Sequence, residues 1–227
     1  MTVLSTLGKD RRYQRKKMLD ALASRGECTL TDAQTVNSLA GGLRKGKVIV
    51  DGDVADYFGI LNAGAELIVN GSAGRFAGDC MTSGVITISG DAGEGLGDYC
   101  YGGTCHVKGS VGNFIGTMNK GGTIVVEGDA GHDAGTYMTS GEIVILGSAG
   151  PNLGNYIISG SIYVLGGFED LGENATEERM VTSDFDRLSA VLNGLGVEAE
   201  IKSFRKIVPL SAKPFYKEKP KRAEVRP

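Results

Sequence analysis

Two consecutive 19-residue stretches decide the fold of this chain: residues 84–102 read GVITISGDAGEGLGDYCYG, and residues 103–121 read GTCHVKGSVGNFIGTMNKG. The glycines of the two stretches fall at matching places. The same spacing continues in both directions over seven units, without an insertion or a deletion, from about residue 46 to residue 172. A constant period of this length indicates a solenoid, in which each unit forms one coil stacked on the previous one.

Three glycines of each unit form the motif G-x-x-G-x-x-x-G. We expect glycine where the chain turns with a positive φ, or where stacked backbones come too close for a Cβ atom. We therefore assign a structural role to the copies of this motif. They are Gly71, Gly74, Gly78, Gly90, Gly93, Gly97, Gly109, Gly112, Gly116, Gly128, Gly131, Gly135, Gly147, Gly150 and Gly154.

A strand precedes the motif in each unit, because apolar and more polar residues alternate there with many β-branched side chains. One inward column holds Val48, Leu67, Ile86, Cys105, Ile124, Ile143 and Ile162. We expect a last inward column at Leu61, Cys80, Tyr99, Met118, Tyr137 and Tyr156. Aspartate and serine alternate after the first motif glycine, where short polar side chains can accept hydrogen bonds from local backbone amides.

These columns predict an all-β fold, a single-stranded right-handed parallel β-helix of about seven 19-residue coils. Coils stacked about 4.8 Å apart give a cylinder roughly 34 Å long. Left-handed β-helices follow a six-residue period that 19 does not fit, and parallel β connections are overwhelmingly right-handed.

We divide the chain into an N-terminal helical cap (residues 1–45), the β-helix (residues 46–172), and a C-terminal cap helix with a basic tail (residues 173–227). The caps cover the open ends of the stack. Helices are predicted at residues 10–24 and 31–44, and another is capped by Ser183 or Asp184 and continues through Leu192. Phe204, Ile207 and Val208 are expected to form a strand or to pack against the body of the chain, and the tail that follows is expected to be extended or disordered.

The composition excludes several classes of protein. Glycine accounts for 36 of the 227 residues, but only five prolines and 41% hydrophobic residues argue against collagen and against disorder. The four cysteines form no C-x-x-C pair, and no apolar run approaches the roughly 18 residues of a membrane span. We therefore expect a cytoplasmic protein with no membrane partner and no structural disulfide.

Charge is concentrated at the two ends of the sequence. Residues 1–25 carry seven Lys or Arg and two Asp, and residues 213–227 carry six Lys or Arg and two Glu, although the whole chain has a net charge of −3. These ends lack interleaved aromatic residues, so we do not expect a nucleic-acid partner. We interpret them as a solvated helix face and a tail that docks on an acidic partner or on the body of the chain.

The candidate reactive residues have structural interpretations, and we predict no catalytic, cofactor-binding or metal-binding residue. Gly93–Gly97 lacks the strand-turn-helix context of a dinucleotide site. The single Asp or Ser of each coil is too few ligands for calcium. His106 points outward beside the core residue Cys105, and His132 occupies a variable turn more than one coil away, so no metal site is implied.

One pair of carboxylates supports an alternative function. Asp79 and Asp98 are equivalent residues of adjacent coils, and a separation of about 5 Å would raise the pKa of one of them. A stand-alone β-helical enzyme acting on a polysaccharide could use such a pair.

The motif at Gly71-Ser72-Ala73-Gly74 and Gly78, with its copies, resembles the C-terminal β-helical (GXGXG) domain of the glutamate synthase large subunit. That domain is also a free-standing protein in split glutamate synthases and in N-methylglutamate synthases. The resemblance covers about residues 31–208. One of the subunits of formylmethanofuran dehydrogenase, with its counterpart in formyltransferase/hydrolase complexes, is similar too.

The resemblance implies a scaffold rather than an enzyme. In that family an N-terminal cysteine releases ammonia from glutamine, and a flavin domain with an iron–sulfur cluster reduces 2-iminoglutarate. This sequence begins Met1-Thr2-Val3 and has no cluster-like cysteine spacing. The expected partners are therefore amidotransferase and FMN-containing synthase subunits of a glutamate biosynthesis complex, with a homo-oligomer left open. The alternative is a scaffold of a formylmethanofuran dehydrogenase or formyltransferase/hydrolase complex.

Overall fold

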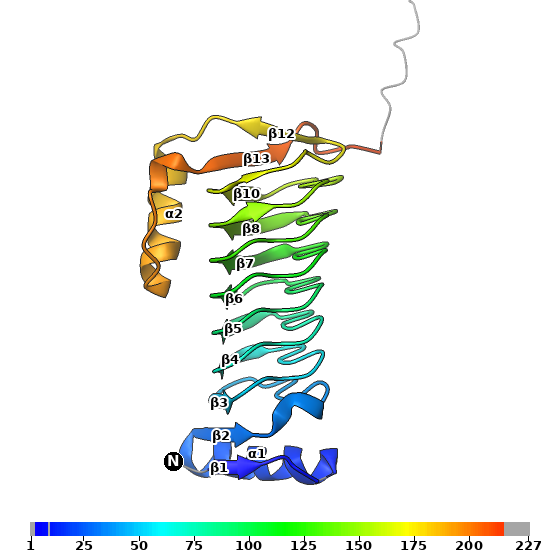
Figure 1. The fold of residues 1–227 in the computed structure, drawn as a ribbon, viewed down its shortest axis with the longest axis vertical. Helices are drawn as coiled ribbons and strands as arrows, with labels where there is room; N and C mark the ends of the chain where they lie inside the picture. The colour runs from blue at the N-terminus through cyan, green and yellow to red at the C-terminus, as the bar shows by residue number, and fades with distance from the viewer. Residues whose placement is uncertain (1–2, 9, 216–227) are drawn as a thin grey trace, which may run out of the picture.

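The computed structural model describes residues 3–8 and 10–215, which form a tall stack of coils with non-repeating chain at each end (Figure 1). The elements in chain order are β1 (Val3–Ser5), α1 (Arg11–Arg25), β2 (Glu27–Thr31), the 3-10 turn η1 (Ala33–Thr35), β3 (Lys47–Asp51), β4 (Ala63–Val69), β5 (Ser83–Ile88), β6 (Thr104–Val107), β7 (Lys120–Val126), β8 (Ser140–Ile145), β9 (Ser148–Ala149), β10 (Ser161–Val164), β11 (Gly167–Phe168), β12 (Ala175–Glu178), α2 (Thr182–Leu195), the 3-10 turn η2 (Ile201–Ser203) and β13 (Arg205–Pro209).

The main sheet lies along one side of the stack. Its strand order follows the chain from β1 to β8 and then passes through β10, β13 and β12. In this sheet the strands from β1 to β10 are parallel, and between β3 and β10 most residues pair with those 19 positions further on, as Val48 does with Leu67. A second ladder joins successive coils through their small residues, for example Ala73 and Ala92. The predicted parallel β-solenoid of about seven 19-residue coils is confirmed.

The hydrophobic core fills the interior of the coils. The inward column that begins at Val48 is buried throughout, as are the equivalents of Phe58 that lie across from it. Because the coils stack in register, each buried side chain rests on its equivalents above and below, and the core is continuous along the stack.

The prediction that Leu61 and its equivalents face inward is wrong. All six residues of that column have a positive φ, between 53° and 59°. A residue in the left-handed conformation breaks the alternation of a strand, so the side chain of the following residue enters the core instead. The true inward column is Asn62, Met81, Cys100, Asn119, Met138 and Ile157, and each of these residues is at most 2% exposed.

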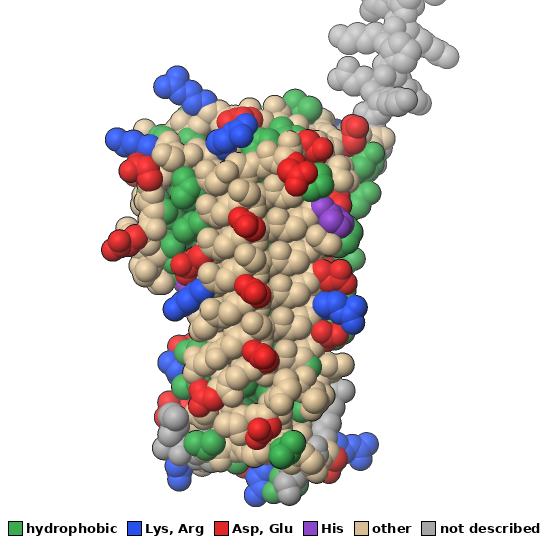
Figure 2. All heavy atoms as spheres, in the orientation of Figure 1, with side chains coloured by type: hydrophobic (Ala, Val, Ile, Leu, Met, Phe, Trp, Pro, Cys, Tyr) green, Lys and Arg blue, Asp and Glu red, His purple; other side chains and the backbone are tan. Residues whose placement is uncertain are grey.

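The alternating aspartates and serines bind the neighbouring coil rather than local amides. The Asp53 carboxylate accepts a hydrogen bond from the backbone N–H of Ser72 (2.8 Å), and the Ser72 hydroxyl accepts one from the N–H of Asp91 (3.2 Å). The pattern continues through Ser110 and Asp129. Figure 2 shows acidic side chains at regular intervals along one face of the stack. This polar ladder therefore holds each coil to the next.

The N-terminal region is only partly helical. The helix predicted at residues 10–24 is confirmed as α1, with Asp10 as its N-cap and Gly26 as its C-cap. The helix predicted at residues 31–44 is wrong, because this segment contains only η1 followed by turns. β2 pairs with β3, and the buried Leu39 and Leu43 enter the core like Phe58 and Asn62 one coil later. This segment is therefore an additional coil.

The C-terminal region folds back over the end of the stack. Of the two interpretations of the segment containing Ile207, the strand is confirmed: β13 pairs antiparallel with β10 and with β12. The predicted cap helix is α2, but the predicted N-cap at Ser183 or Asp184 is wrong, because the N-cap is Val181 and Asp184 lies in the first turn, where its carboxylate accepts the Val181 N–H (2.9 Å). The helix ends at Leu195, beyond the predicted end at Leu192. It lies against the outer side of the sheet beside β10 and β8 (Figure 1). The tail predicted to be extended or disordered falls largely on residues 216–227, outside the described residues. No helix among the described residues has the length and apolarity needed to cross a membrane.

Candidate functional site

A ridge of turns runs along one edge of the stack and carries several partly exposed aromatic side chains, among them Tyr99, Phe114 and Tyr137. Two positions of each turn adopt the left-handed conformation, and apart from Gly95 they are occupied by residues other than glycine, which is uncommon for large side chains. The conformation is held by hydrogen bonds to the next coil, such as Tyr57 N–H to Arg75 O (2.8 Å) and Tyr99 N–H to Thr117 O (2.9 Å). We call this edge the turn ridge. Its second column is Leu61, Cys80, Tyr99, Met118, Tyr137 and Tyr156.

The aromatic side chains of the turn ridge stack from coil to coil. The rings of Tyr57 and Phe76 are 5.1 Å apart and nearly parallel, and those of Tyr137 and Tyr156 are 5.5 Å apart. Tyr99 nevertheless remains 41% exposed. Large rings that stay partly exposed on a rigid edge form a surface suited to contact with another chain segment.

Asp79 and Asp98 lie on the turn ridge, and the structure brings them together as the sequence predicted. Asp98 is only 7% exposed. Burial raises the Asp98 pKa to about 7, and the negative charges of Asp79 and Glu94 add to the effect, whereas a hydrogen bond from Thr117 N–H (3.0 Å) opposes it. Burial also raises the Asp79 pKa. Desolvation rather than pairing is therefore the main cause of both shifts.

The burial of Asp98 depends on a neighbouring glycine. Phe114 and Phe76 occupy the equivalent turn position in the coils on either side of Gly95. A Cβ atom on Gly95 would overlap the Phe76 ring and come within 3.1 Å of the Asp98 carboxylate. Because Gly95 has no side chain, the Phe76 ring can occupy the space next to Gly95 and the Asp98 carboxylate. The glycine-rich run at residues 93–97 makes room for a ring, and it opens no helix.

The motif glycines fall into two groups by geometry. Gly71, Gly74 and their equivalents sit where a Cβ atom would meet the previous coil at 3.0 Å or less. Gly78 and its equivalents have φ between 63° and 73°, the left-handed region that glycine adopts without strain. Both groups of glycines are required by the stacking and turning of the coils. Neither group forms an exposed loop that could hold a ligand.

The histidines are held by carboxylates. His106 is 3% exposed, and its Nε2 lies 2.8 Å from Glu127 Oε1. His132 Nδ1 lies 2.6 Å from Asp133 Oδ2. The part of the chain that the structure describes brings together no group of three or more His, Cys, Asp or Glu side chains suited to a metal ion.

The thiols are poorly activated. Burial raises the pKa values of Cys28 and Cys80 to about 11. A hydrogen bond between the Cys100 and Cys105 thiols, together with burial, raises the pKa of Cys100. Because the thiolate is the reactive form of cysteine, these surroundings disfavour nucleophilic chemistry at neutral pH.

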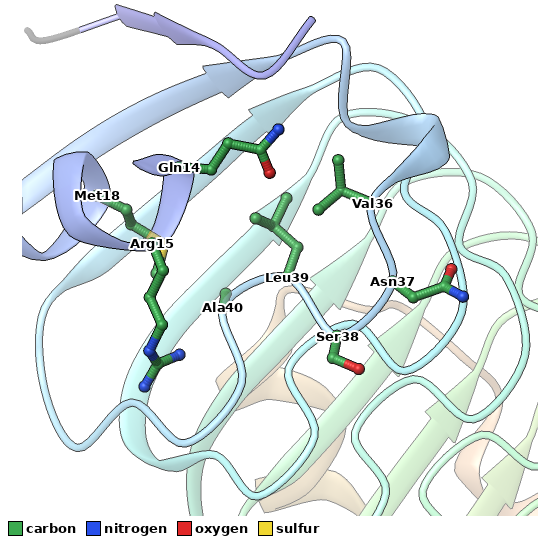
Figure 3. Close-up of a pocket in the computed structure, with 8 residues that line it drawn as sticks. All are labelled: Gln14, Arg15, Met18, Val36, Asn37, Ser38, Leu39 and Ala40. Atoms are coloured by element: carbon green, nitrogen blue, oxygen red, sulfur yellow. The ribbon is translucent and has the colours of Figure 1, made fainter. Parts of the chain in front are cut away.

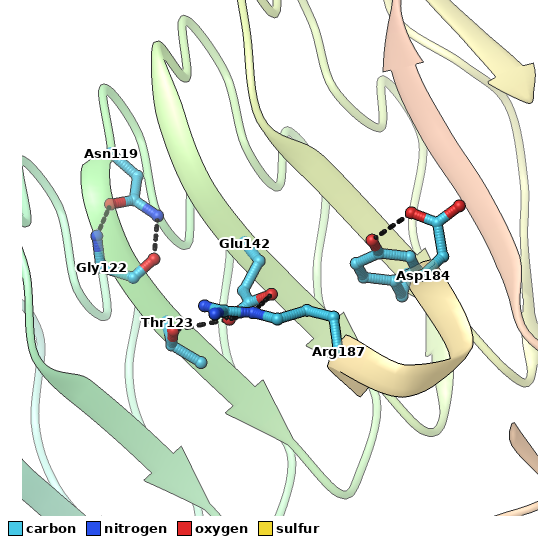
Figure 4. Close-up of polar contacts among 7 residues, drawn as sticks. Asn119, Gly122, Thr123, Glu142, Asp184 and Arg187 are labelled. Carbon is cyan, nitrogen blue, oxygen red and sulfur yellow. Dashed lines mark hydrogen bonds and ion pairs between the residues drawn. The ribbon is translucent and has the colours of Figure 1, made fainter. Parts of the chain in front are cut away.

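A polar network fixes α2 to the sheet, and sequence analysis did not predict it (Figure 4). Arg187 of α2 makes a bidentate ion pair with Glu142, a residue of β8, at 2.7 and 3.1 Å. Tyr163 donates a hydrogen bond to Asp184 at 3.1 Å. The sequence did contain a signal: the outward positions Val125 and Val144 are apolar although Thr87 is equivalent to them, which indicates that another element covers these strands.

Several hollows flank α1 at the N-terminal end of the stack. One has a volume of about 270 Å³ and lies between Arg15 and Met18 of α1 and the loop around Leu39 (Figure 3). Another, of about 570 Å³, is lined by residues that include Leu22 of α1 and Arg44. Arg15 crosses this region to donate a hydrogen bond to Gly41 O at 2.9 Å. Their position shows how α1 covers the end of the stack.

Comparison with known proteins agrees with the resemblance seen in the repeat. Residues 98–208 match the model of the family described as GXGXG motif. This segment extends from the coil that contains Asp98 to β13. No curated protein matches the sequence. The GXGXG motif is associated with glutamate synthase-type proteins. Residues 98–208 of this chain, with the stacked coils and closing strands described above, are therefore similar to the GXGXG motif family.

Proposed function

We propose that this chain is a non-catalytic scaffold subunit of a glutamate synthase-like complex in the cytoplasm. In this proposal a glutamine amidotransferase partner releases ammonia, and an FMN-containing, iron–sulfur synthase partner uses it to make glutamate. The observation that carries the proposal is the match of residues 98–208 to a family associated with glutamate synthase-type proteins.

The way the coils are held together supports a scaffold role. Backbone hydrogen bonds connect each coil to the next on the sheet side and on the turn ridge. The ladder that includes Asp91 and Ser110 adds side-chain contacts along a further face. A stack joined on several sides resists bending, and a rigid body of roughly 34 Å can hold two partners at a fixed separation.

Several side chains of the types that often act in catalysis make structural hydrogen bonds in this fold. The carboxylates of Asp91 and Asp129 accept backbone amides of the following coil, and Glu127 holds His106 beside the sheet. Such engagement is what a structural subunit requires, and it supports placing the flavin and the cluster in the partner subunits.

The proposal is tested by isolating the chain with its native partners. An affinity tag on the genomic copy, followed by mass spectrometry and absorption spectroscopy, should recover an amidotransferase and a flavoprotein in a fixed ratio to this chain. Recovery of the chain alone would refute the proposal. Recovery with molybdenum, tungsten or formyltransferase subunits would support the alternative scaffold of a formylmethanofuran dehydrogenase or formyltransferase/hydrolase complex.

One observation favours a second candidate, a stand-alone enzyme acting on a polysaccharide. A general acid works best when its pKa lies near the operating pH, and the pKa of Asp98 is raised to about 7. Turnover of a polysaccharide that disappears in Asp98→Asn and persists in Asp129→Asn would establish this activity. The absence of turnover by the wild-type chain on a broad panel would exclude it for those substrates.

A further inference from the structure

The N-terminal end of the stack carries an excess of positive charge. α1 lies across this end, opposite the end that β12 and β13 close (Figure 1). The acidic residues of α1 and its N-cap are Asp20 and Asp10, and the Asp10 carboxylate already accepts two backbone N–H groups of the first turn. The exposed cations of α1 and of the loop before β3 include Arg12, Arg15, Lys16, Lys17, Arg44 and Lys45. This end therefore attracts negatively charged groups.

An apolar hollow opens beside these cations. It has a volume of about 570 Å³, and its lining includes Arg15, Leu19, Leu22, Leu43, Arg44 and Lys45. Leu19 remains 40% exposed although it belongs to a helix that covers the core. We call this site the basic cap hollow. An apolar centre beside charged groups is the usual composition of a protein interface.

The walls of the basic cap hollow are fixed by backbone hydrogen bonds. At the end of α1, the Gly26 N–H donates to Leu22 O (2.9 Å), and Gly26 O accepts the Lys47 N–H (2.9 Å). On the other wall, the Gly42 N–H donates to Ile60 O of the next coil (2.8 Å). A site whose walls are already ordered loses little conformational entropy when it binds a partner.

The cations that line the hollow are available to a partner. No carboxylate of the described residues forms an ion pair with Arg15, Arg44 or Lys45. Arg15 uses one of its nitrogens to donate to Gly41 O, and it reaches that carbonyl by extending along the loop that contains Ala40 (Figure 3). Its remaining N–H donors suit a carboxylate.

We propose that the basic cap hollow binds an acidic segment of a partner protein. An apolar side chain of that segment lies against Leu19 and Leu22, and its carboxylates pair with Arg15, Arg44 and Lys45. In the complex proposed above, the segment belongs to one of the partner subunits. The identity of the partner thus rests on the proposed function, whereas the chemistry of the surface does not.

The shape of the site favours a protein segment over other anionic partners. A nucleic acid would match the cations through its phosphates and would leave the apolar lining without a partner. A membrane would require a wide apolar face on α1, but Met18 and Ala21 are buried in the core of the stack. A concave site of this volume can receive apolar side chains.

A defined peptide tests the proposal. The probe is a fluorescein-labelled peptide of glutamates with leucines at every third or fourth position, and its binding to the full-length chain is followed by fluorescence anisotropy. Full-length Arg44→Glu/Lys45→Glu should bind it about tenfold more weakly, because two attractive contacts become repulsive. Leu19→Ser should bind it about threefold to tenfold more weakly, because an apolar contact is lost.

The matched control carries the same change in net charge far from the hollow. Lys202 and Lys213 are exposed and lie in η2 and after β13. Lys202→Glu/Lys213→Glu should bind the peptide within about twofold of the wild type, because charges more than a Debye length away are screened. Unchanged melting temperatures in all variants separate loss of binding from loss of fold.

The outcomes that would overturn the proposal are distinct. Equal weakening in the two double variants would show that only net charge matters. A peptide with serine in place of each leucine that binds as tightly would remove the apolar contact. Tighter binding of phosphatidylserine vesicles or of single-stranded RNA, with the same dependence on Arg44 and Lys45, would make one of these the occupant, and a peptide that does not bind the wild type would leave the hollow without its proposed ligand. None of these results affects which subunits copurify with the tagged chain, so failure here is distinguishable from failure of the proposed function.

Discussion

The stacking of coils makes a specific prediction for Gly112→Ala. A Cβ atom at Gly112 would lie 2.7 Å from Glu94 N and 3.0 Å from Glu94 Cα, whereas ordinary contacts begin at 3.4 Å. Both atoms are backbone, so the clash cannot be relieved by rotation of a side chain. The coil must move away by about 0.7 Å, which stretches bonds such as Gly112 N–H to Ala92 O (3.0 Å).

The expected loss follows from this overpacking. Extra methyl groups in well-packed interiors destabilise proteins by about 1–3 kcal/mol, and a clash with backbone belongs at the upper end. For a chain of this length, 1 kcal/mol lowers the melting temperature by about 2–4 °C. We therefore expect Gly112→Ala to melt about 4–12 °C below the wild type when unfolding is followed by far-ultraviolet circular dichroism.

Gly194→Ala is the matched control. Gly194 lies in α2, and a Cβ atom there would have no neighbour within 4 Å. Alanine favours a helix over glycine by about 0.5–1 kcal/mol, so this variant should melt slightly above the wild type. An unchanged melting temperature for Gly112→Ala would refute the close approach of coils on which the explanation of the motif rests.

Three other substitutions test separate parts of the structure. Burial raises the Asp98 pKa to about 7 from 3.8. Between about pH 4 and pH 7 the folded chain therefore retains a proton that the unfolded chain has lost. The free energy of unfolding should consequently fall as pH rises through this window. In thermal melts, Asp98→Asn should consequently exceed wild type at about pH 8 and lose that advantage at about pH 4; an equal advantage at both would contradict the assignment. Asn119→Ala removes a buried amide that binds both Gly122 N–H (2.8 Å) and Gly122 O (2.9 Å), and urea unfolding should show a loss of about 2–4 kcal/mol. Arg187→Met leaves the buried Glu142 without its bidentate partner and should lose about 1–2 kcal/mol, most of which Glu142→Gln should restore in the double variant; no recovery would show that the pair is not coupled.

The coil architecture was readable from the sequence because one physical requirement repeats. Gly71 and its equivalents are needed wherever backbones of adjacent coils meet, so the same residue recurs with every coil. The inward columns that include Val48 and Val50 followed from simple alternation in the strands. The alternation rule failed at Leu61, because a residue with positive φ changes which side chain faces inward. Tyrosine and methionine at that position gave no hint of a left-handed backbone.

The first coil was hidden by a small irregularity. Cys28 pairs with Val48, one residue further along than the period of 19. Ser38, Ala40 and Gly42 have the positive φ values of the later turns, although only one of them is glycine. The strict glycine period therefore begins one coil too late and misses the first coil. The residues of that coil resemble a short helix in composition.

The candidate site was predicted in part. The proximity of Asp79 and Asp98 follows from the period, since equivalent residues stack. The burial that mainly raises the Asp98 pKa cannot be deduced from the period, because it depends on how Phe76 fills the space above Gly95. The ion pair between Arg187 and Glu142 joins residues 45 positions apart outside the repeat, so no spacing rule could have indicated it.

The most direct test of the scaffold proposal is a reconstitution of glutamate synthesis from the separate subunits. Glutamate formation from glutamine and 2-oxoglutarate is measured with and without this chain, alongside two partial reactions: glutamine hydrolysis by the amidotransferase, and ammonia-dependent synthesis by the flavoprotein. The account predicts that omitting the chain lowers the glutamine-dependent rate and leaves both partial reactions intact. A glutamine-dependent rate that is the same without the chain would contradict it.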